Sequence, residues 1–129
     1  EGCNMTPLTV LALLAALQVK HLIADYALQS AWMVHNKGIY GHPGGLAHAG
    51  IHAGLTLVAL VPFGLPVLMV LALAAAEFVI HYHIDWAKQR VTEPQNLTPA
   101  DKMFWVLFGA DQFLHQLTYL GLVWVLVAH

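Results

Sequence analysis

The sequence predicts an all-α fold, namely an integral membrane protein built as an antiparallel four-helix bundle. Of its 129 residues, 59% are hydrophobic and only 9% are charged, whereas a soluble domain has about 25% charged residues. So few charged side chains cannot cover a soluble surface, and the apolar remainder is therefore expected to face lipid. Four long apolar segments, separated by Gly, Pro and polar residues, supply the helices. We expect them to form a single membrane domain over residues 1–129.

The first helix is expected over residues 7–36. Thr6 is a favourable N-cap residue, and Pro7 suits the first helical position because the N–H that it lacks would have no partner there. The C-terminal half of this helix carries a polar stripe at helical spacing, formed by Gln18, His21, Asp25 and Gln29. A glycine-rich loop follows, and three residues typical of a membrane interface flank it: Trp32, Lys37 and Tyr40.

The second helix is expected over residues 46–61 and the third over residues 66–90, with an uncharged turn rich in proline and glycine between them. His48 and His52 lie four residues apart in the first turns of the second helix. The third helix carries three ionisable residues at intervals of four, and therefore on one face: Glu77, His81 and Asp85. Such groups are costly to bury in an apolar segment unless they pair or bind a cation, so each is a candidate functional residue.

The fourth helix is expected over residues 99–128. The segment Thr98–Asp101 repeats the Thr-Pro start of the first helix and adds an acid at the third helical position, an arrangement close to a capping box. Asp111 and His115 lie four residues apart in the first half of this helix, and its second half is almost wholly apolar.

Each predicted helix therefore carries one pair of metal-capable side chains spaced four residues apart. The pairs lie late in the first and third helices and early in the second and fourth, so an up-and-down bundle brings them to one depth. The predicted metal ligands are His21, Asp25, His48, His52, His81, Asp85, Asp111 and His115. Imidazole and carboxylate donors favour Zn, with Fe and Mn as alternatives. Cys3 is the only cysteine, which excludes an intrachain disulfide and a site made of several thiolates.

Eight donors exceed the needs of one tetrahedral zinc ion. Either two metals bind, or one binds while the remaining acids hold the ligand imidazoles and serve as a general base. Asp85 and Asp111 are the candidate catalytic residues, as ligands or as water-activating bases, and Asp25 is expected to orient His21. The alternative is a metal-free network of Asp–His hydrogen bonds that only fixes helix packing.

The remaining polar residues are interpreted one by one. Glu77 lies one turn deeper than the pairs, and is either a ligand or supporting acid, or a partner for a neighbouring helix. Gln29 is a candidate to hold substrate or a loop backbone. The other histidines have no comparable partner and are interpreted as interfacial or loop residues: His35, His42, His83 and His129.

The basic residues indicate an orientation. All five lie at helix ends or in loops on the side that holds the pairs: Lys20, Lys37, Lys88, Arg90 and Lys102. By the positive-inside rule this side is cytoplasmic, and both termini lie on the far side. These residues form no long basic cluster and the formal net charge is −2, which argues against nucleic acid as a partner.

The polar motifs together resemble a bacterial inner-membrane family known as domain-of-unknown-function family 3307. The resemblance covers about residues 5–127, and the residues that carry it are His21, Asp25, Gln29, Lys37, His48, His52, His81, Asp85, Asp111, Gln112 and His115. It implies a small multi-pass protein of the bacterial inner membrane, but no established reaction. A looser likeness through His and Asp pairs links the chain to bacterial membrane proteins assigned as metal-dependent hydrolases.

Three functions follow as hypotheses. The leading one is a metal-dependent hydrolase that acts on a lipid-linked or membrane-embedded substrate. The alternative is a non-enzymatic accessory subunit of a larger membrane complex, whose cluster is structural or binds haem or another pigment, for example through His52 with His81 or His115. The third is a proton or metal-ion pathway, which the scarcity of polar groups in the far half of the bundle argues against. The expected partners are the lipid bilayer and other subunits of such a complex.

Overall fold

The computed structural model describes residues 5–129, and over this range the chain is all-α. Cys3 lies outside the described residues. The helices are α1 (Pro7–Leu22), α2 (Ala31–Asn36), α3 (Pro43–Leu60), α4 (Val67–Thr92) and α5 (Lys102–Ala128). A π-helical turn over Ile23–Ala27 follows α1, and short 3-10 turns over Val61–Phe63 and Glu93–Gln95 follow α3 and α4. The predicted all-α fold is confirmed.

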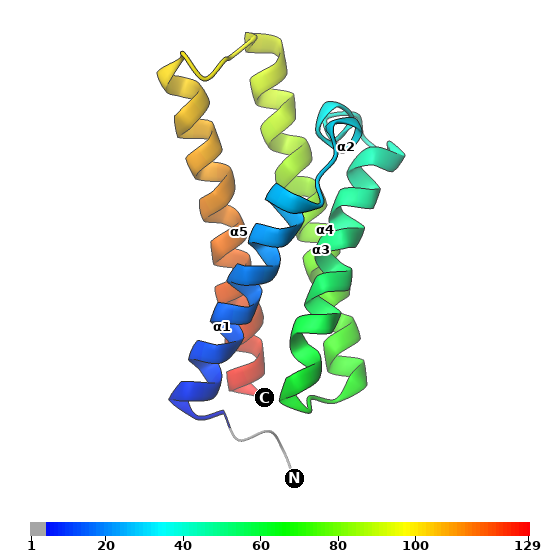
Figure 1. Ribbon diagram of the computed structural model, residues 1–129, viewed down its shortest axis with the longest axis vertical. Coiled ribbons are helices and arrows are strands. Elements are labelled where there is room, and N and C mark those ends of the chain that lie inside the picture. The colour runs from blue at the N-terminus through cyan, green and yellow to red at the C-terminus, as the bar shows by residue number, and fades with distance from the viewer. Residues whose placement is uncertain (1–4) are drawn as a thin grey trace.

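The four long helices alternate in direction along the chain (Figure 1). α1 packs against α3 and α5, and α4 packs against the same two helices, so α1 and α4 face each other across the bundle. The short helix α2 packs against α3. The start of α1 and the end of α5 lie at the same end of the bundle (Figure 1).

The single helix predicted over residues 7–36 is interrupted. After α1 the Leu28 N–H donates to the Ile23 carbonyl at 3.0 Å, an i to i−5 bond that widens the turn. Ser30 then acts as an N-cap, because its hydroxyl accepts the Met33 N–H at 3.3 Å and starts α2. The wide turn contains Asp25, and such turns are frequent at functional sites.

The starts of the later helices also differ from the prediction. α3 begins three residues early because His42 is its N-cap and Pro43 its first residue, with the His42 Nδ1 accepting the Gly44 N–H at 3.0 Å. α5 begins at Lys102, and the Asp101 carboxylate accepts the N–H of Thr98 at 2.8 Å and its hydroxyl at 2.9 Å. These two bonds hold the pKa of Asp101 below its usual range, and the bond from the backbone N–H contributes more than the bond from the hydroxyl.

Within residues 5–129, three helical segments are long and apolar enough to cross a membrane: Pro7–Ala27, Pro43–Phe63 and Val67–Gln95. α5 is of similar length but carries four polar residues in its middle, Asp111, Gln112, His115 and Gln116. Large apolar side chains cover the outside, with Leu68 80% exposed, while Glu77 is 0% exposed. This distribution is the reverse of that in a soluble domain and suits a chain surrounded by lipid.

The half of the bundle nearest the termini is held together mainly by apolar packing. Its core consists of Leu13, Leu17, Leu60, Leu73, Tyr119, Leu122, Val123 and Leu126. These side chains come from all four long helices, so they fix how the helices meet. The polar pairs on the same helices, one to three turns further along, are thereby directed toward one another.

The loop between α2 and α3 is tied to α4 by Tyr82. The buried Tyr82 hydroxyl accepts the Gly41 N–H at 2.6 Å, at a glycine whose φ of 78° lies in the left-handed region.

Tyr82→Phe removes one hydrogen bond and is expected to lower the free energy of unfolding by about 1 kcal/mol, measured by reversible unfolding in mixed detergent micelles. Tyr40→Phe is the control, because among the described residues the Tyr40 hydroxyl bonds to His83, which is exposed. Equal losses in the two variants would contradict this role for Tyr82.

Candidate metal centre

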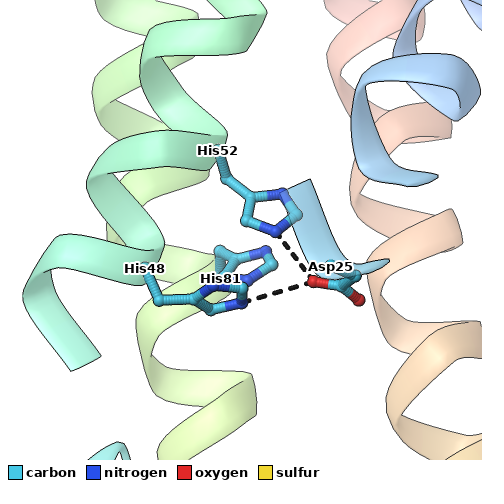
Figure 2. A group of neighbouring side chains, drawn as sticks. All are labelled: Asp25, His48, His52 and His81. Atoms are coloured by element: carbon cyan, nitrogen blue, oxygen red, sulfur yellow. Dashed lines mark hydrogen bonds and ion pairs between the residues drawn. The ribbon is translucent and has the colours of Figure 1, made fainter. Parts of the chain in front are cut away.

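The first half of the site is built around the Asp25 carboxylate. Its Oδ1 lies 2.9 Å from His52 Nε2 and 3.3 Å from His48 Nε2, both on α3. Its Oδ2 lies 3.1 Å from His21 Nε2, one turn earlier on its own segment. Figure 2 shows the imidazoles of His48, His52 and His81 gathered beside this carboxylate. One acid from the π-helical turn therefore contacts three imidazoles from two helices.

The second half is built around the Asp85 carboxylate on α4. Its Oδ2 lies 3.2 Å from His48 Nε2 and 3.4 Å from His81 Nε2, and its Oδ1 lies 3.3 Å from His115 Nε2 on α5. The Lys37 ammonium donates to Oδ2 at 3.1 Å. The His48 imidazole thus lies between the two carboxylates, within 3.3 Å of each.

The imidazole rings are packed against one another. The ring of His81 stacks on that of His52 with centroids 3.7 Å apart and on that of His115 with centroids 4.1 Å apart. All five histidines of the predicted pairs are buried. With Asp111 Oδ1 at 3.4 Å from His115 Nε2, the structure brings all eight predicted residues into one connected cluster, contributed by each of the four long helical segments.

Two groups within this cluster are arranged so that they could hold a metal ion. The first consists of Asp25, His48, His52 and His81, and the second of His81, Asp85 and His115. Within each group the potential ligand atoms all lie within 4.8 Å of one another. Because His81 belongs to both, an ion in one group competes with an ion in the other for this imidazole. His21 and Asp111 belong to neither group.

Several ring nitrogens in the cluster have no hydrogen-bond partner among residues 5–129. Both nitrogens of His48 and both nitrogens of His81 are buried and unpaired, as is Asp111 Oδ1. His48 Nε2 lies close to two carboxylates but without the geometry of a hydrogen bond. Leaving a buried polar atom unpaired costs about 1–3 kcal/mol, so such atoms in a polar cluster require an explanation. A cation bound by one nitrogen of each ring accounts for one of these atoms in His48 and one in His81.

His21 is held in place by groups outside the predicted set. Its Nδ1 forms a hydrogen bond with the Tyr119 hydroxyl at 2.7 Å, and its Nε2 lies 3.0 Å from Gln112 Oε1. Both partners are on α5, and the Gln112 amide also lies 3.4 Å from Asp25 Oδ2. Besides Asp25, whose Oδ2 lies 3.1 Å from the His21 Nε2, two groups on α5 therefore hold the His21 imidazole.

Two lysines that sequence reasoning assigned to helix ends are buried in the cluster. Lys20 forms an ion pair with Glu77, and the Thr56 hydroxyl donates to the same carboxylate. The Lys20 ammonium also lies 3.4 Å from His52 Nδ1. Of the two alternatives for Glu77, the structure therefore favours a partner for neighbouring helices. Lys20 was detectable from the sequence, because it continues the buried face of α1 that Leu13 and Leu17 begin.

Lys37 was interpreted as an interfacial residue, and this interpretation is wrong. Its side chain is buried and its ammonium joins the Asp85 carboxylate to Gln29, whose Oε1 accepts at 3.0 Å. The Gln29 amide in turn donates to the Asp25 carbonyl at 3.1 Å. Gln29 therefore holds the backbone of the wide turn and a cation of the cluster at the same time. No feature of the local sequence indicates that Lys37 folds back onto α4.

The fold and this cluster can be compared with known proteins. A family profile described as a protein of unknown function (DUF3307) matches residues 13–129, a range that contains all eight predicted site residues. Comparison with curated proteins and with solved structures gave no match. The family shown by the profile is the one that the motifs resemble. Because this profile matches almost the whole length of the chain, the chain belongs to the DUF3307 family of proteins of unknown function.

Proposed function

We propose that this protein spans a bacterial inner membrane with its four long helices and binds a divalent metal ion, zinc in the first place, through Asp25, His48, His52 and His81. The observation that carries the proposal is the set of four buried ring nitrogens of His48 and His81 without a hydrogen-bond partner. Three imidazoles and one carboxylate form a donor set that suits zinc. Their arrangement within 4.8 Å of one another supports a shared ion.

Around this group, the second carboxylate serves a different purpose. Asp85 contacts His48, His81 and His115 and is neutralised by Lys37. A carboxylate that contacts ligand imidazoles orients them and raises their basicity. We assign Asp85 to this supporting role. Because the His81 imidazole belongs to both groups and cannot bind an ion in each, we propose that one metal ion binds and not two.

We further propose a hydrolase. A bound zinc ion supplies a water of lowered pKa and polarises a carbonyl or phosphoryl oxygen. Asp111 is the better candidate for the general base, because its Oδ1 is buried without a hydrogen-bond partner and lies 3.4 Å from His115 Nε2. Asp85 is already engaged by four cationic or imidazole groups. Because the site lies among helices with lipid-facing surfaces, we expect a lipid-linked or membrane-embedded substrate.

The alternatives fit the geometry less well. Rings stacked at 3.7 and 4.1 Å leave no room for a porphyrin between His52 and His81 or between His81 and His115. An ion pathway needs polar groups along the whole bundle, whereas the half nearest the termini has an apolar core. An accessory subunit with a purely structural network remains as the competing proposal, and it predicts that no metal binds.

We propose the same orientation, with the cluster toward the cytoplasm, but fewer basic residues support it than the sequence suggested. Lys20 and Lys37 are neutralised inside the bundle by Glu77 and Asp85, and Lys88 lies 3.7 Å from Asp111. Arg90 and Lys102 are the exposed basic residues at the same end. The positive-inside rule counts such residues at the ends of spans.

Elemental analysis of gently purified full-length protein, without chelator, tests the metal site. Wild type is expected to contain about one zinc per chain, and His52→Ala and His81→Ala much less, because each removes one of four ligands. His83→Ala is the matched control, since His83 is exposed and bonds to Tyr40 and its own helix. Wild type that contains no metal, and takes up none when titrated with zinc, would contradict the proposal and support the structural network.

A further inference from the structure

A vestibule of about 660 Å³, lined by both polar and apolar residues, lies between α2, the end of α4 and the start of α5. Gln29 and Lys37 line it, and Lys37 contacts Asp85 directly. Gln89, Thr92 and Lys88 line the α4 side. Among the lining residues that the structure describes, Glu93 is the only acid against the two lysines. The vestibule therefore presents amide, hydroxyl and ammonium donors next to the metal centre.

An apolar groove of about 570 Å³ runs along the outside of the bundle between α4 and α5. Its walls include Val79, Ile80, Ala87, Ala110 and Leu114, of which the large side chains are exposed and would face the acyl region of a bilayer. Volumes of this size are typical of ligand sites. A hydrocarbon chain is the chemistry that such walls accept.

Lys88 lines both spaces. Its ammonium lies 3.7 Å from Asp111 Oδ2 and 5.4 Å from the centre of the Phe108 ring, which belongs to the vestibule. Asp111 lines the groove and contacts His115 of the cluster. An amphiphile with its chain in the groove therefore has its polar end at Lys88, between Lys37 and Asp111.

From this junction we infer that the protein binds a lipid with a phosphate headgroup, the headgroup held by Lys88 in the vestibule and one chain lying in the groove between α4 and α5. Lysine is a common phosphate-binding residue, acting as a point charge. This inference rests on the proposed function, because it names the class of substrate that would reach the metal centre.

A second groove allows a matched control. It has a volume of about 650 Å³ and adjoins the first groove along the same two helices, sharing Ile80, Ile84 and Leu114 with it. Of the two grooves, only the second is lined by Leu73, Ala76 and Leu117. No charged residue lines it within residues 5–129. Ala76 and Ala87 are both exposed residues of α4, one in each groove, so the same substitution can be made in both.

Binding of long-chain phosphatidic acid to the purified full-length protein, measured by native mass spectrometry, tests the inference. Diacylglycerol of the same chain length lacks the phosphate, and inorganic phosphate lacks the chain. Wild type is expected to bind phosphatidic acid at least about tenfold more tightly than either. Lys88→Gln and Ala87→Trp are each expected to weaken binding by about tenfold or more, while Lys88→Arg and Ala76→Trp bind like wild type.

The zinc content of the same samples separates this inference from the proposed function. Loss of phosphatidic acid binding in Lys88→Gln at unchanged zinc content supports the inference. Equal binding of diacylglycerol and phosphatidic acid, or unchanged binding by both Lys88→Gln and Ala87→Trp, would overturn it whatever the metal content. If wild type contains no zinc but binds phosphatidic acid in a way that depends on Lys88, the lipid site is supported and only the metal centre is overturned.

Discussion

Lys20→Met is expected to lower the free energy of unfolding by about 3–5 kcal/mol. Lys20 and Glu77 are both buried, the latter completely, and they neutralise each other between α1 and α4. Removal of the ammonium leaves the buried Glu77 carboxylate without its countercharge, while the Thr56 hydroxyl still donates to it. An uncompensated charge in an apolar interior is among the most destabilising consequences of a single substitution. Reversible unfolding in mixed detergent micelles measures the loss.

The double variant Lys20→Met/Glu77→Leu distinguishes this cause from a simple loss of packing. If the unpaired charge is responsible, removal of both charges recovers most of the stability, because apolar replacements of a buried ion pair are often neutral. The exposed Arg90 supplies the control, and Arg90→Met is expected to change stability by no more than about 0.5 kcal/mol. A double variant as unstable as Lys20→Met would show that the lysine contributes mainly through its contacts with other groups.

The cluster itself was predictable because helical spacing and helix order contain the necessary information. His81 and Asp85 must lie on one face of any helix that contains both. When four apolar segments each carry such a pair, and the pairs alternate between late and early positions, antiparallel packing has to bring them together. To predict the cluster it was enough to know that the four helices exist, and long apolar segments are a strong signal for membrane helices.

The break in the first helix was not predictable from the same information. The spacing of Gln18, His21, Asp25 and Gln29 suits an uninterrupted helix, and it also suits α1 followed by one wide turn. Ser30 is a common N-cap residue, but it also occurs within helices. What decides between them is a set of tertiary contacts, above all the hydrogen bonds of Gln29 to the Asp25 carbonyl and to Lys37.

The roles of the individual residues depend on packing distances that spacing cannot give. His21 and Asp111 satisfy the spacing rule as well as His52 and Asp25 do, yet neither belongs to a group that could hold a metal. Tyr119 and Gln112 on α5 draw His21 away from the centre of the cluster. Long side chains add further uncertainty, because lysine carries its charge far from its backbone position.

Asp25→Asn is expected to reduce zinc affinity by more than about 100-fold, since even outer-shell substitutions cost about 10–100-fold. The side chains are nearly the same size, so the packing of the helices should persist. What is lost is the negative charge within 3.3 Å of both His48 and His52. Zinc titration against a competing chelator measures the affinity. Zinc at about 100 times the wild-type Kd should also stabilise wild type by about 2.7 kcal/mol and Asp25→Asn by no more than about 0.4 kcal/mol.

Asp111→Asn is the informative comparison for this experiment. Asp111 lies outside both candidate groups, so this variant is expected to keep the zinc affinity of wild type while losing any hydrolytic activity that needs a general base. If Asp25→Asn bound zinc normally and Asp85→Asn did not, the ion would belong to His81, Asp85 and His115 instead. Asp111 Oδ1, which has no hydrogen-bond partner among residues 5–129, would then lie 3.4 Å from a ligand of the ion, His115 Nε2. The two assignments therefore differ in which carboxylate binds the metal, and only the second places Asp111 in direct contact with a metal ligand.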